Sequence, residues 1–351
     1  MTAPPAEGAI DADVHVAPES IDALTPYMDD YWRDYLANAG LVLSPNVGGS
    51  YPPSAPRPPS ELGALREQVL DPWQLRHAVL TCLTAFDASR NGYYEAALCR
   101  AINDWLRAEW LDRDERLRAY LTIPTLDPDA ALKEVERVGS HDGFVGVLVP
   151  IRGETRWGNR RYHDLHEAIA AQDLVLALHA WGRAGSAPTA SGFTHTYFED
   201  YLANSQIIAQ AQVMSLVAEG VFDRVPTLRV ALLECGFSWL PPMLWRFDKD
   251  WKAVWREVPW LKERPSEYVK RHVRAATAPA QLPGDPQQAA QLAAMLGASD
   301  MLVFASDFPH EHGEGNLDTL LGALDDDGRE AVLRDNAAAL YGLAGSSGTF
   351  A

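Results

Sequence analysis

Cysteines and long apolar runs are scarce in this sequence. Its three cysteines, Cys82, Cys99 and Cys235, are widely spaced and form no C-x-x-C pair. We therefore expect neither a disulfide framework nor a zinc ribbon, and a reducing compartment fits this cysteine usage. No apolar run approaches the ~18 residues that cross a bilayer, and residues 1–8 lack the basic and apolar regions of a signal peptide. These absences predict a cytoplasmic protein without a transmembrane segment.

Positive charge is also in short supply. The chain has 30 Lys and Arg residues against 48 Asp and Glu residues, a formal net charge of −18. A nucleic-acid binder needs clustered cations to neutralise phosphates, and an anionic membrane surface would repel such a chain. The 47% hydrophobic and 22% charged residues are typical of a soluble globular protein. We expect a small-molecule substrate and no nucleic-acid or membrane partner.

Short β-rich runs alternate with helical stretches along the chain. Most of the β-rich runs are near-continuously apolar, as in strands that are buried on both faces. Strands are predicted at Ala9–Val16, Ala78–Leu83, Leu117–Ile123, Phe144–Val149, Leu174–His179, Leu228–Glu234, His272–Ala276 and Met301–Ser306. Helices are predicted at Tyr93–Trp110, Asp129–Val138, Tyr162–Gln172, Tyr201–Glu219, Pro286–Leu296 and Arg329–Leu343.

This alternation predicts the α/β fold class. Eight strands interleaved with helices favour a single domain over residues 1–351, a (β/α)8 TIM barrel with inserted loops and extra helices. A doubly wound sheet is the alternative, but it usually has a Gly-rich first turn, and no G-x-G-x-x-G follows any predicted strand.

Two loops are expected to border a pocket. Ser44–Ser60 holds six prolines in seventeen positions, which excludes a helix or a central strand. A loop of that length in a compact domain is usually functional or disordered. Thr189–Tyr197 adds His195 as a candidate substrate contact. An exposed loop histidine is the ordinary alternative for His195.

The predicted strand ends carry carboxylates and imidazoles. Asp13 and His15 are two residues apart on the first strand, so they point the same way, and Asp11 shares their face. The fifth strand ends at His179, the sixth at Glu234, and the eighth is followed by Asp307 and His310. In a TIM barrel these ends meet at one rim. Together they predict a site for one divalent ion, with Zn favoured and Mn or Fe as alternatives.

Each of these residues also has an ordinary explanation. Asp-x-His occurs often by chance, a lone histidine after an apolar strand is usually a core residue, and Asp307 could cap the turn before Phe308. The coincidence of four such strand ends favours the metal site. His163, His166 and Glu167 form H-x-x-H-E, which matches no metalloprotease pattern, and a solvated or packing role is expected for them.

Five of the eleven tryptophans lie between Trp239 and Trp260. Packing of an added helix against the barrel or a partner subunit is the favoured interpretation, and we expect a homo-oligomer, in the simplest case a dimer. An aromatic wall over the pocket is the alternative. Trp239 is nearest the sixth strand end and is therefore the tryptophan expected to contact substrate.

Several of these segments resemble motifs of a known family. Asp11-Ala-Asp-Val-His15, Leu178-His179, Leu233–Pro241, Trp245-Arg-Phe-Asp248 and Phe304–His310 resemble motifs of the amidohydrolase superfamily. The similar branch includes aminocarboxymuconate semialdehyde decarboxylase and the resorcylate decarboxylases. The resemblance extends over nearly the full length and implies a (β/α)8 barrel with one divalent metal.

The resemblance also implies roles for individual residues. Asp13 and His15 match the first-strand ligand pair, His179 the fifth-strand ligand and Asp307 the eighth-strand carboxylate. Asp13 departs from the His or Glu often found there, which shifts preference toward harder ions. Many members have a histidine at the sixth strand end, where this chain has Glu234 and Cys235. We expect Glu234 to act as an acid or base, although Cys235 is the position that matches.

Two reactions and one non-catalytic role are compatible with these residues. In hydrolysis, Asp307 would accept a proton from a metal-activated water and return it to the leaving group. In non-oxidative decarboxylation of a small aromatic or unsaturated acid, Asp307 or Glu234 would protonate carbon. His310 is a further candidate for proton transfer. Hydrolysis of a small organic metabolite is placed slightly ahead, and a ligand-binding barrel without turnover is the remaining alternative.

Overall fold

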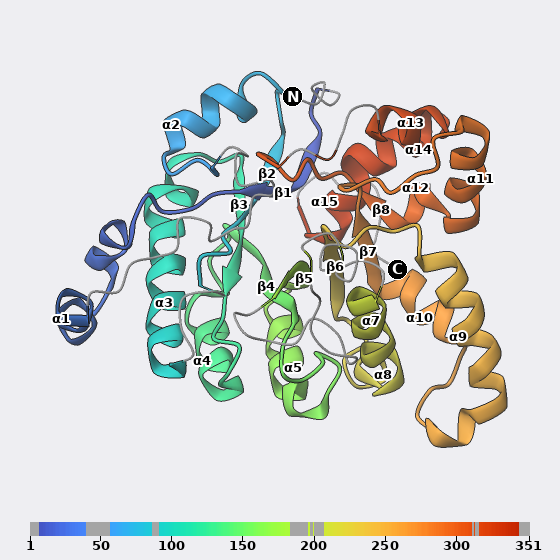
Figure 1. The fold of residues 1–351 in the computed structure, drawn as a ribbon, viewed down its shortest axis with the longest axis horizontal. Helices are drawn as coiled ribbons and strands as arrows, with labels where there is room; N and C mark the ends of the chain where they lie inside the picture. The colour runs from blue at the N-terminus through green and yellow to red at the C-terminus, as the bar shows by residue number, and fades with distance from the viewer. Residues whose placement is uncertain are drawn as a thin grey trace.

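The computed structural model describes residues 7–39, 57–85, 91–182, 196, 199, 207–310, 312 and 316–343. Eight parallel strands form one sheet in which each strand pairs with the next in sequence, from β1 to β8 (Figure 1). The strands are β1 Ile10–His15, β2 His77–Thr81, β3 Leu117–Thr122, β4 Phe144–Arg152, β5 Val175–Gly182, β6 Arg229–Leu233, β7 Val273–Ala276 and β8 Leu302–Val303. Their order confirms the predicted (β/α)8 architecture.

The sheet closes between its last and first strands. Past β8 the chain continues beside β1, where Ala12 N donates to Phe304 O at 2.9 Å and His15 N donates to Phe308 O at 2.8 Å. Val14 and Phe308 form an isolated parallel bridge. These contacts complete the ring of strands and bring the residues after β8 directly against the end of β1.

The eighth strand is shorter than the predicted Met301–Ser306. Met301 ends helix α12 (Ala298–Met301), and β8 spans only Leu302 and Val303. The next two amides bond outside the β7–β8 ladder, because Phe304 N donates to Val332 O and Ala305 N donates to Thr277 Oγ1. Side-chain and helix acceptors thus replace regular strand pairing just before the site.

Helices surround the strands along the sides and lower edge of Figure 1. Helix α4 begins as the sequence predicts, because Asp127 accepts from Asp129 N and Ala130 N, and Pro128 occupies its first position. The longer helices are α1 Asp30–Ala39, α3 Gly92–Glu109, α4 Pro128–Val138, α5 His163–Ala171, α7 Ala209–Ala218, α9 Leu240–Val254, α10 Pro265–His272 and α11 Pro286–Leu296. The shorter ones are α2 Leu62–Leu65, α8 Val221–Arg224, α13 Asn316–Gly322, α14 Asp326–Glu330 and α15 Asn336–Leu340.

Two predicted helices differ from the structure. Tyr201–Glu219 begins in residues that lie outside the described ones, and its described part forms α7. Arg329–Leu343 is not one regular helix, because a π-helical turn at Ala331–Asp335 separates α14 from α15. In the part of the chain that the structure describes, no helix is long and apolar enough to cross a membrane.

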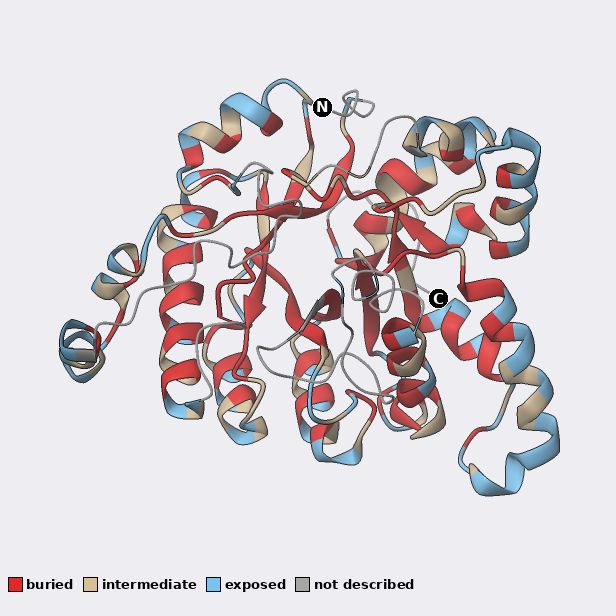
Figure 2. Cartoon of the chain, viewed as in Figure 1, coloured by how far each residue is buried: buried red, intermediate tan, exposed pale blue. Residues whose placement is uncertain are grey.

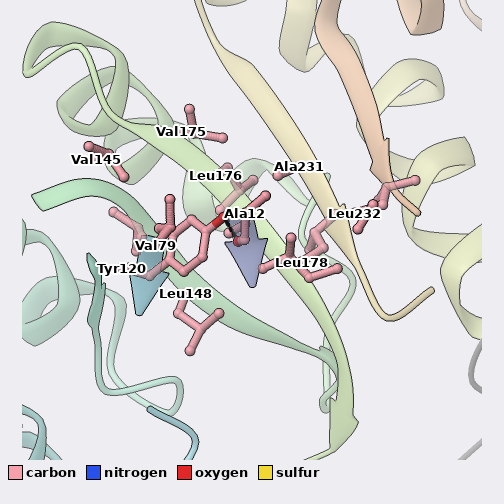
Figure 3. Packing of buried hydrophobic residues seen from close by; sticks show 14 of the residues in the cluster. Ala12, Val79, Tyr120, Val145, Leu148, Val175, Leu176, Leu178, Ala231 and Leu232 are labelled. Carbon is pink, nitrogen blue, oxygen red and sulfur yellow. Dashed lines mark hydrogen bonds between the residues drawn. The ribbon is translucent and has the colours of Figure 1, made fainter. Parts of the chain in front are cut away.

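The apolar strands fill the interior of the barrel. Figure 2 shows the strands in red, buried on both faces, with exposed residues confined to the outer helices and turns. In Figure 3, Tyr120 on β3 lies among Val79 of β2, Leu148 of β4 and Leu176 of β5, and its hydroxyl donates to Ala12 O at 2.8 Å. Each such side chain stabilises the fold by about 1.5–3 kcal/mol when buried, so the interior is a packed core that supports the rim.

Candidate metal centre

Four predicted site residues lie together at the C-terminal ends of the strands. Ligand atoms of Asp13, His15, His179 and Asp307 are all within 4.8 Å of one another, and all four residues are buried. His15 Nε2 lies 3.5 Å from Asp13 Oδ1 and 2.7 Å from Asp307 Oδ1. His179 Nε2 lies 3.4 Å from Asp13 Oδ2. Residues almost 300 positions apart in the sequence therefore form one cluster.

Strand geometry explains how these side chains meet. Asp13 and His15 alternate along β1, and His179 is on β5, where it is in register with Leu233 of β6. Asp307 follows β8 at a φ of +56°, and Asp307 N donates to Asp13 O at 3.1 Å. Asp is among the non-glycine residues that adopt this left-handed conformation most readily. The turn directs the Asp307 carboxylate back over the end of β1.

The donor set fits a divalent metal ion. Asp13 Oδ2 and His179 Nε2 are buried, and neither has a hydrogen-bond partner among the described residues. Buried polar atoms without partners are costly and uncommon, and a cation between these atoms would satisfy both. Two carboxylates and two imidazoles are ligands suited to Zn²⁺, Mn²⁺ or Fe²⁺.

Two residues, Thr81 and Asp11, hold Asp13 and the neighbouring backbone in place. Thr81 Oγ1, at the end of β2, donates to Asp13 Oδ1 at 2.5 Å. Asp11 Oδ1 accepts from Asp13 N at 3.2 Å and from Ser306 N at 3.0 Å, so it links β1 to the segment that leads into Asp307. Burial raises the pKa of Asp11 to about 7. Asp11 lies on the face predicted from strand alternation, whereas Thr81 was not predicted because it looks like an ordinary strand residue.

Asp307 also has two histidines on its outer side. His310 Nδ1 lies 3.0 Å from Asp307 Oδ1, and His312 Nε2 is hydrogen-bonded to Asp307 Oδ2. Burial alone would raise the pKa of Asp307, but the positive charges of His310 and His15 hold it well below its usual range. Burial lowers the pKa of His310, whereas Asp307 raises it more strongly, to about 9. His312 was missed; the H-x-H spacing after Pro309 is the signal that could have found it.

At the sixth strand end, Glu234 faces the cluster and Cys235 does not. Glu234 Oε2 lies 3.9 Å from His179 Nδ1, and Glu234 forms a second group of potential ligands with Asp307 and His312. Burial and the Asp307 carboxylate raise the pKa of Glu234 to about 7. The Cys235 thiol instead donates to Leu178 O at 3.6 Å, inside the core.

The remaining candidates lie elsewhere. Trp239 is 4% exposed, and its indole N–H donates to Cys235 O at 2.9 Å, so the structure gives it a packing position. Contact between Trp239 and substrate stays a prediction. His166 is buried within α5, as its packing role requires. His195, most of Ser44–Ser60 and Thr189–Tyr197 apart from Thr196 lie outside the described residues.

The chain is similar to several known proteins. It is 27% identical over 271 residues to "Gamma-resorcylate decarboxylase" of Rhodococcus jostii, covering 70% of this chain and 77% of that protein. The fold matches 2,6-dihydroxybenzoate decarboxylase from Rhizobium with a TM-score of 0.66 and 22% identity, over 97% of this chain and 100% of that one.

A third similar protein carries a metal. The fold matches dihydroxybenzoic acid decarboxylase from a Polaromonas species, solved with bound manganese and the inhibitor 2-nitroresorcinol. The TM-score is 0.65 at 19% identity, and the match covers 96% of this chain and 98% of that one.

The family assignment rests on a match over almost the whole chain. The family model described as "Amidohydrolase" matches residues 10–343, which include every residue of the buried cluster. Its relatives are enzymes, and this chain is accordingly a metal-dependent hydrolase or carboxy-lyase. The chain belongs to the amidohydrolase family.

Proposed function

We propose that this enzyme is a non-oxidative decarboxylase of a hydroxylated aromatic acid. The single observation that carries the proposal is the position of Asp307. One of its oxygens faces His15 and His310, and the other is hydrogen-bonded to His312. A carboxylate among metal-ligand side chains is thereby connected to two imidazoles that can supply a proton. Decarboxylation requires a proton to be delivered to carbon, and this arrangement suits delivery.

The similar proteins support the same reaction class. The curated relative and the two solved structures described above are all named as decarboxylases of dihydroxylated benzoates. Decarboxylation is therefore placed ahead of hydrolysis, which the sequence alone favoured slightly. The similarity also weighs against a barrel that binds a ligand without turnover.

The proposed mechanism assigns a step to each part of the cluster. Asp13, His15, His179 and Asp307 would hold a divalent ion, which would supply Lewis-acid polarisation of the substrate. Asp307, which is ionised at rest, relays a proton from His310 to the ring carbon that bears the carboxylate. The bond between that carbon and the carboxylate then breaks, its electron pair returns to the ring, and CO2 leaves.

The other residues prepare Asp307 for the next turnover. His310, 3.0 Å from Asp307 Oδ1, passes a proton back to it, and His312 on the second oxygen provides a parallel route. Glu234 lies beside the cluster, near His179 and Asp307, and is assigned a supporting role in proton transfer. Thr81 and Asp11 position Asp13 and do not take part in the proton transfers.

The proposal also covers the metal. We infer one ion per chain, Zn²⁺ by preference, with Mn²⁺ and Fe²⁺ as alternatives. A site with two carboxylates and two imidazoles is harder than a three-histidine site. It therefore favours Mn²⁺ more than a three-histidine site would. Elemental analysis of protein expressed with each metal, followed by activity measurement, identifies the ion that supports turnover.

Product analysis in D2O tests the reaction class. The metal-loaded enzyme is incubated with 2,6-dihydroxybenzoate and other hydroxylated benzoates, and both CO2 and the aromatic product are measured. Decarboxylation releases CO2 and places one deuterium on the carbon that carried the carboxylate. Hydrolysis of ester or amide probes without CO2 release from any benzoate would contradict the proposal and restore the hydrolytic alternative.

A further inference from the structure

A pocket lies at the C-terminal end of the barrel, between the loop after β3 and the loop that joins β4 to α5. Its wall includes polar, charged and aromatic side chains, among them Thr125, Arg152, Glu154, Trp157, Arg161 and Tyr162. Pro150, which also lines it, is in register with His179 on the neighbouring strand, but none of the four clustered residues is in the wall as the structure describes it. Its volume is about 360 Å³ including the solvent at its mouth, which leaves room for a small polar group. We call it the β4–α5 pocket.

The segment that forms most of this pocket is rich in positive charge. Residues 152–161 have four arginines against one glutamate and hence a net charge of +3, whereas the whole chain has a net charge of −18. Two of these arginines, Arg152 and Arg161, line the pocket together with Glu154. Among the described residues, the Arg161 guanidinium has no carboxylate partner, and it lies 5.4 Å from the ring centroid of Tyr162. An arginine without a carboxylate partner beside a pocket favours an anionic ligand.

Tyr162 contributes a hydroxyl that lacks a partner. The residue is only 4% exposed, and no described residue forms a hydrogen bond with its hydroxyl. Burial raises the pKa of the Tyr162 phenol, the positive charge of Arg161 opposes this rise, and Glu154 adds to it. Since these two charged groups line the pocket, we place the hydroxyl on the pocket side of the ring. A buried polar group without a partner is costly, and a ligand oxygen in the pocket would accept its hydrogen bond.

Fixed contacts hold this part of the rim in place. The Trp157 indole N–H donates to Pro150 O at 2.8 Å, and Trp157 N donates to Gln212 Oε1 at 2.9 Å. Gln212 Nε2 in turn donates to Ile151 O at 2.6 Å. The rings of Trp157 and Tyr162 lie with their centroids 4.5 Å apart. The loop is therefore tied to β4 and α7, and a ligand would find the pocket already formed.

The start of helix α5 adds to the preference for negative charge. Tyr162 directly precedes α5, and the Asn159 side chain before it accepts from Arg161 N at 3.1 Å. The N-terminal end of a helix carries a partial positive charge and favours anions. A guanidinium also presents a fork of N–H groups that matches the oxygens of a carboxylate or phosphate. Helix end, guanidinium and phenol thus meet at one pocket.

We propose that the β4–α5 pocket binds a small oxyanion, a carboxylate or phosphate group, through the Arg161 guanidinium and the Tyr162 hydroxyl. The inference does not rest on the proposed function, because the pocket is built without the metal-ligand cluster. Two sources supply such a group: a second acidic group on the substrate, or a separate small anion. Inhibition kinetics distinguish between them.

Isothermal titration calorimetry of the metal-loaded full chain with inorganic phosphate, and separately with acetate, tests the site. We expect at least one of these probes to bind once per chain with a Kd of about 1 mM or tighter. Arg161→Gln should weaken this binding by at least about 10-fold, because it removes a charge-assisted hydrogen bond. Tyr162→Phe keeps the ring against Trp157 and should weaken binding by about 3–10-fold. Arg160→Gln is the matched control, because Arg160 is the adjacent exposed arginine and does not line the pocket; this variant should bind like the wild type.

Three outcomes would overturn the inference. The first is a wild type that binds neither probe at about 10 mM, ten times the expected Kd. The second is binding that Arg161→Gln and Tyr162→Phe leave unchanged, which would place the anion elsewhere, as on the metal. The third is equal weakening by Arg160→Gln, which would indicate a general effect of the charge of the loop. Circular dichroism checks that each variant folds, and the two pocket variants test the site independently of each other.

Steady-state CO2 release from 2,6-dihydroxybenzoate identifies the source of the oxyanion. A competitive rise in KM with phosphate that disappears in Arg161→Gln would assign the pocket to an acidic group of the substrate. An unchanged KM at saturating phosphate would assign it to a separate anion. Weakened phosphate binding by Arg161→Gln supports the inference even if no benzoate releases CO2, and the absence of CO2 release bears only on the proposed function.

Discussion

Replacing Asp307 by Asn removes the proposed proton carrier while keeping the shape of the side chain. The amide retains a carbonyl oxygen for the contacts with His15 and His310, at 2.7 and 3.0 Å. Its nitrogen takes the position of the oxygen that faces His312, and His312 Nε2 can accept a hydrogen bond in one tautomer. Asn also tolerates the φ of +56° at this position. We therefore expect the variant to fold and to retain most of its metal.

The expected loss is confined to the rate of the chemical step. General acid–base help of this kind contributes ~10²–10⁴-fold in rate, which corresponds to ~3–5.5 kcal/mol of activation free energy. The loss should appear in kcat, with KM changed much less, because substrate binding does not depend on the transferred proton. CO2 release and metal content are measured together, so that rate is expressed per bound ion.

Two further variants sharpen the comparison. His310→Asn should reduce kcat less than Asp307→Asn, because His312 provides a second route to the same carboxylate. His163→Asn is the matched control on helix α5, outside the cluster, and should be silent. If Asp307 only shapes the turn before Phe308, Asn should be nearly silent as well. Activity of Asp307→Asn within a few-fold of wild type, per bound metal, would therefore refute the catalytic role.

Three other outcomes are expected. His179→Ala removes a buried ligand and should sharply lower metal content by elemental analysis without unfolding the barrel; wild-type occupancy would contradict the ligand assignment. Asp11→Ala leaves the N–H groups of Asp13 and Ser306 without their buried acceptor and should cost about 2–6 kcal/mol in urea denaturation, whereas Asp11→Asn should cost about 1 kcal/mol or less; equal costs would argue against this linking role. Burial lowers the pKa of His166 to about 3, so on acidification this imidazole is protonated in the unfolded chain before it is protonated in the folded chain. The free energy of unfolding therefore decreases by ~1.4 kcal/mol per pH unit as pH falls from ~6.5 towards 3. Between pH 7 and pH 5, the free energy of unfolding of His166→Leu should fall by about 2 kcal/mol less than that of the wild type. Equal decreases in the two proteins would exclude His166 as the cause.

Much of the barrel follows from the sequence because buried parallel strands are nearly continuous apolar runs. Pro286–Leu296 was predicted with the bounds that α11 has, since Asp285 caps it and Pro286 occupies its first position. The eighth strand was predicted too long. Its apolar run is real, and Phe304 and Ala305 are buried, but their amides bond to Val332 O and Thr277 Oγ1, partners that are distant in sequence. Periodicity predicts burial well, whereas the choice of hydrogen-bond partner is a tertiary property.

The residues that support the cluster are harder to predict than the cluster itself. Thr81 ends an apolar strand and has the β-branched side chain that strands favour, so nothing local distinguishes its hydrogen bond to Asp13. Asp11 shares a face with Asp13 and His15, but alternation does not reveal that its carboxylate accepts backbone N–H groups. Such roles depend on which strands become neighbours when the ring closes.

The direction of a site side chain is predictable from the sequence only as far as the end of each regular strand. Asp13, His15 and His179 lie within β1 and β5, where the two-residue period fixes the direction of each side chain. Glu234 and Asp307 lie just past β6 and β8, at φ values of +53° and +56°, and there the extended geometry no longer applies. Glu234 therefore faces the cluster, whereas Cys235, which the resemblance was expected to place at the family's histidine, points into the core. The directions of the ligands within strands therefore follow from spacing. Asp307 and Glu234 could be named from the sequence because they follow strands, but the backbone turns that aim them are visible only in the structure.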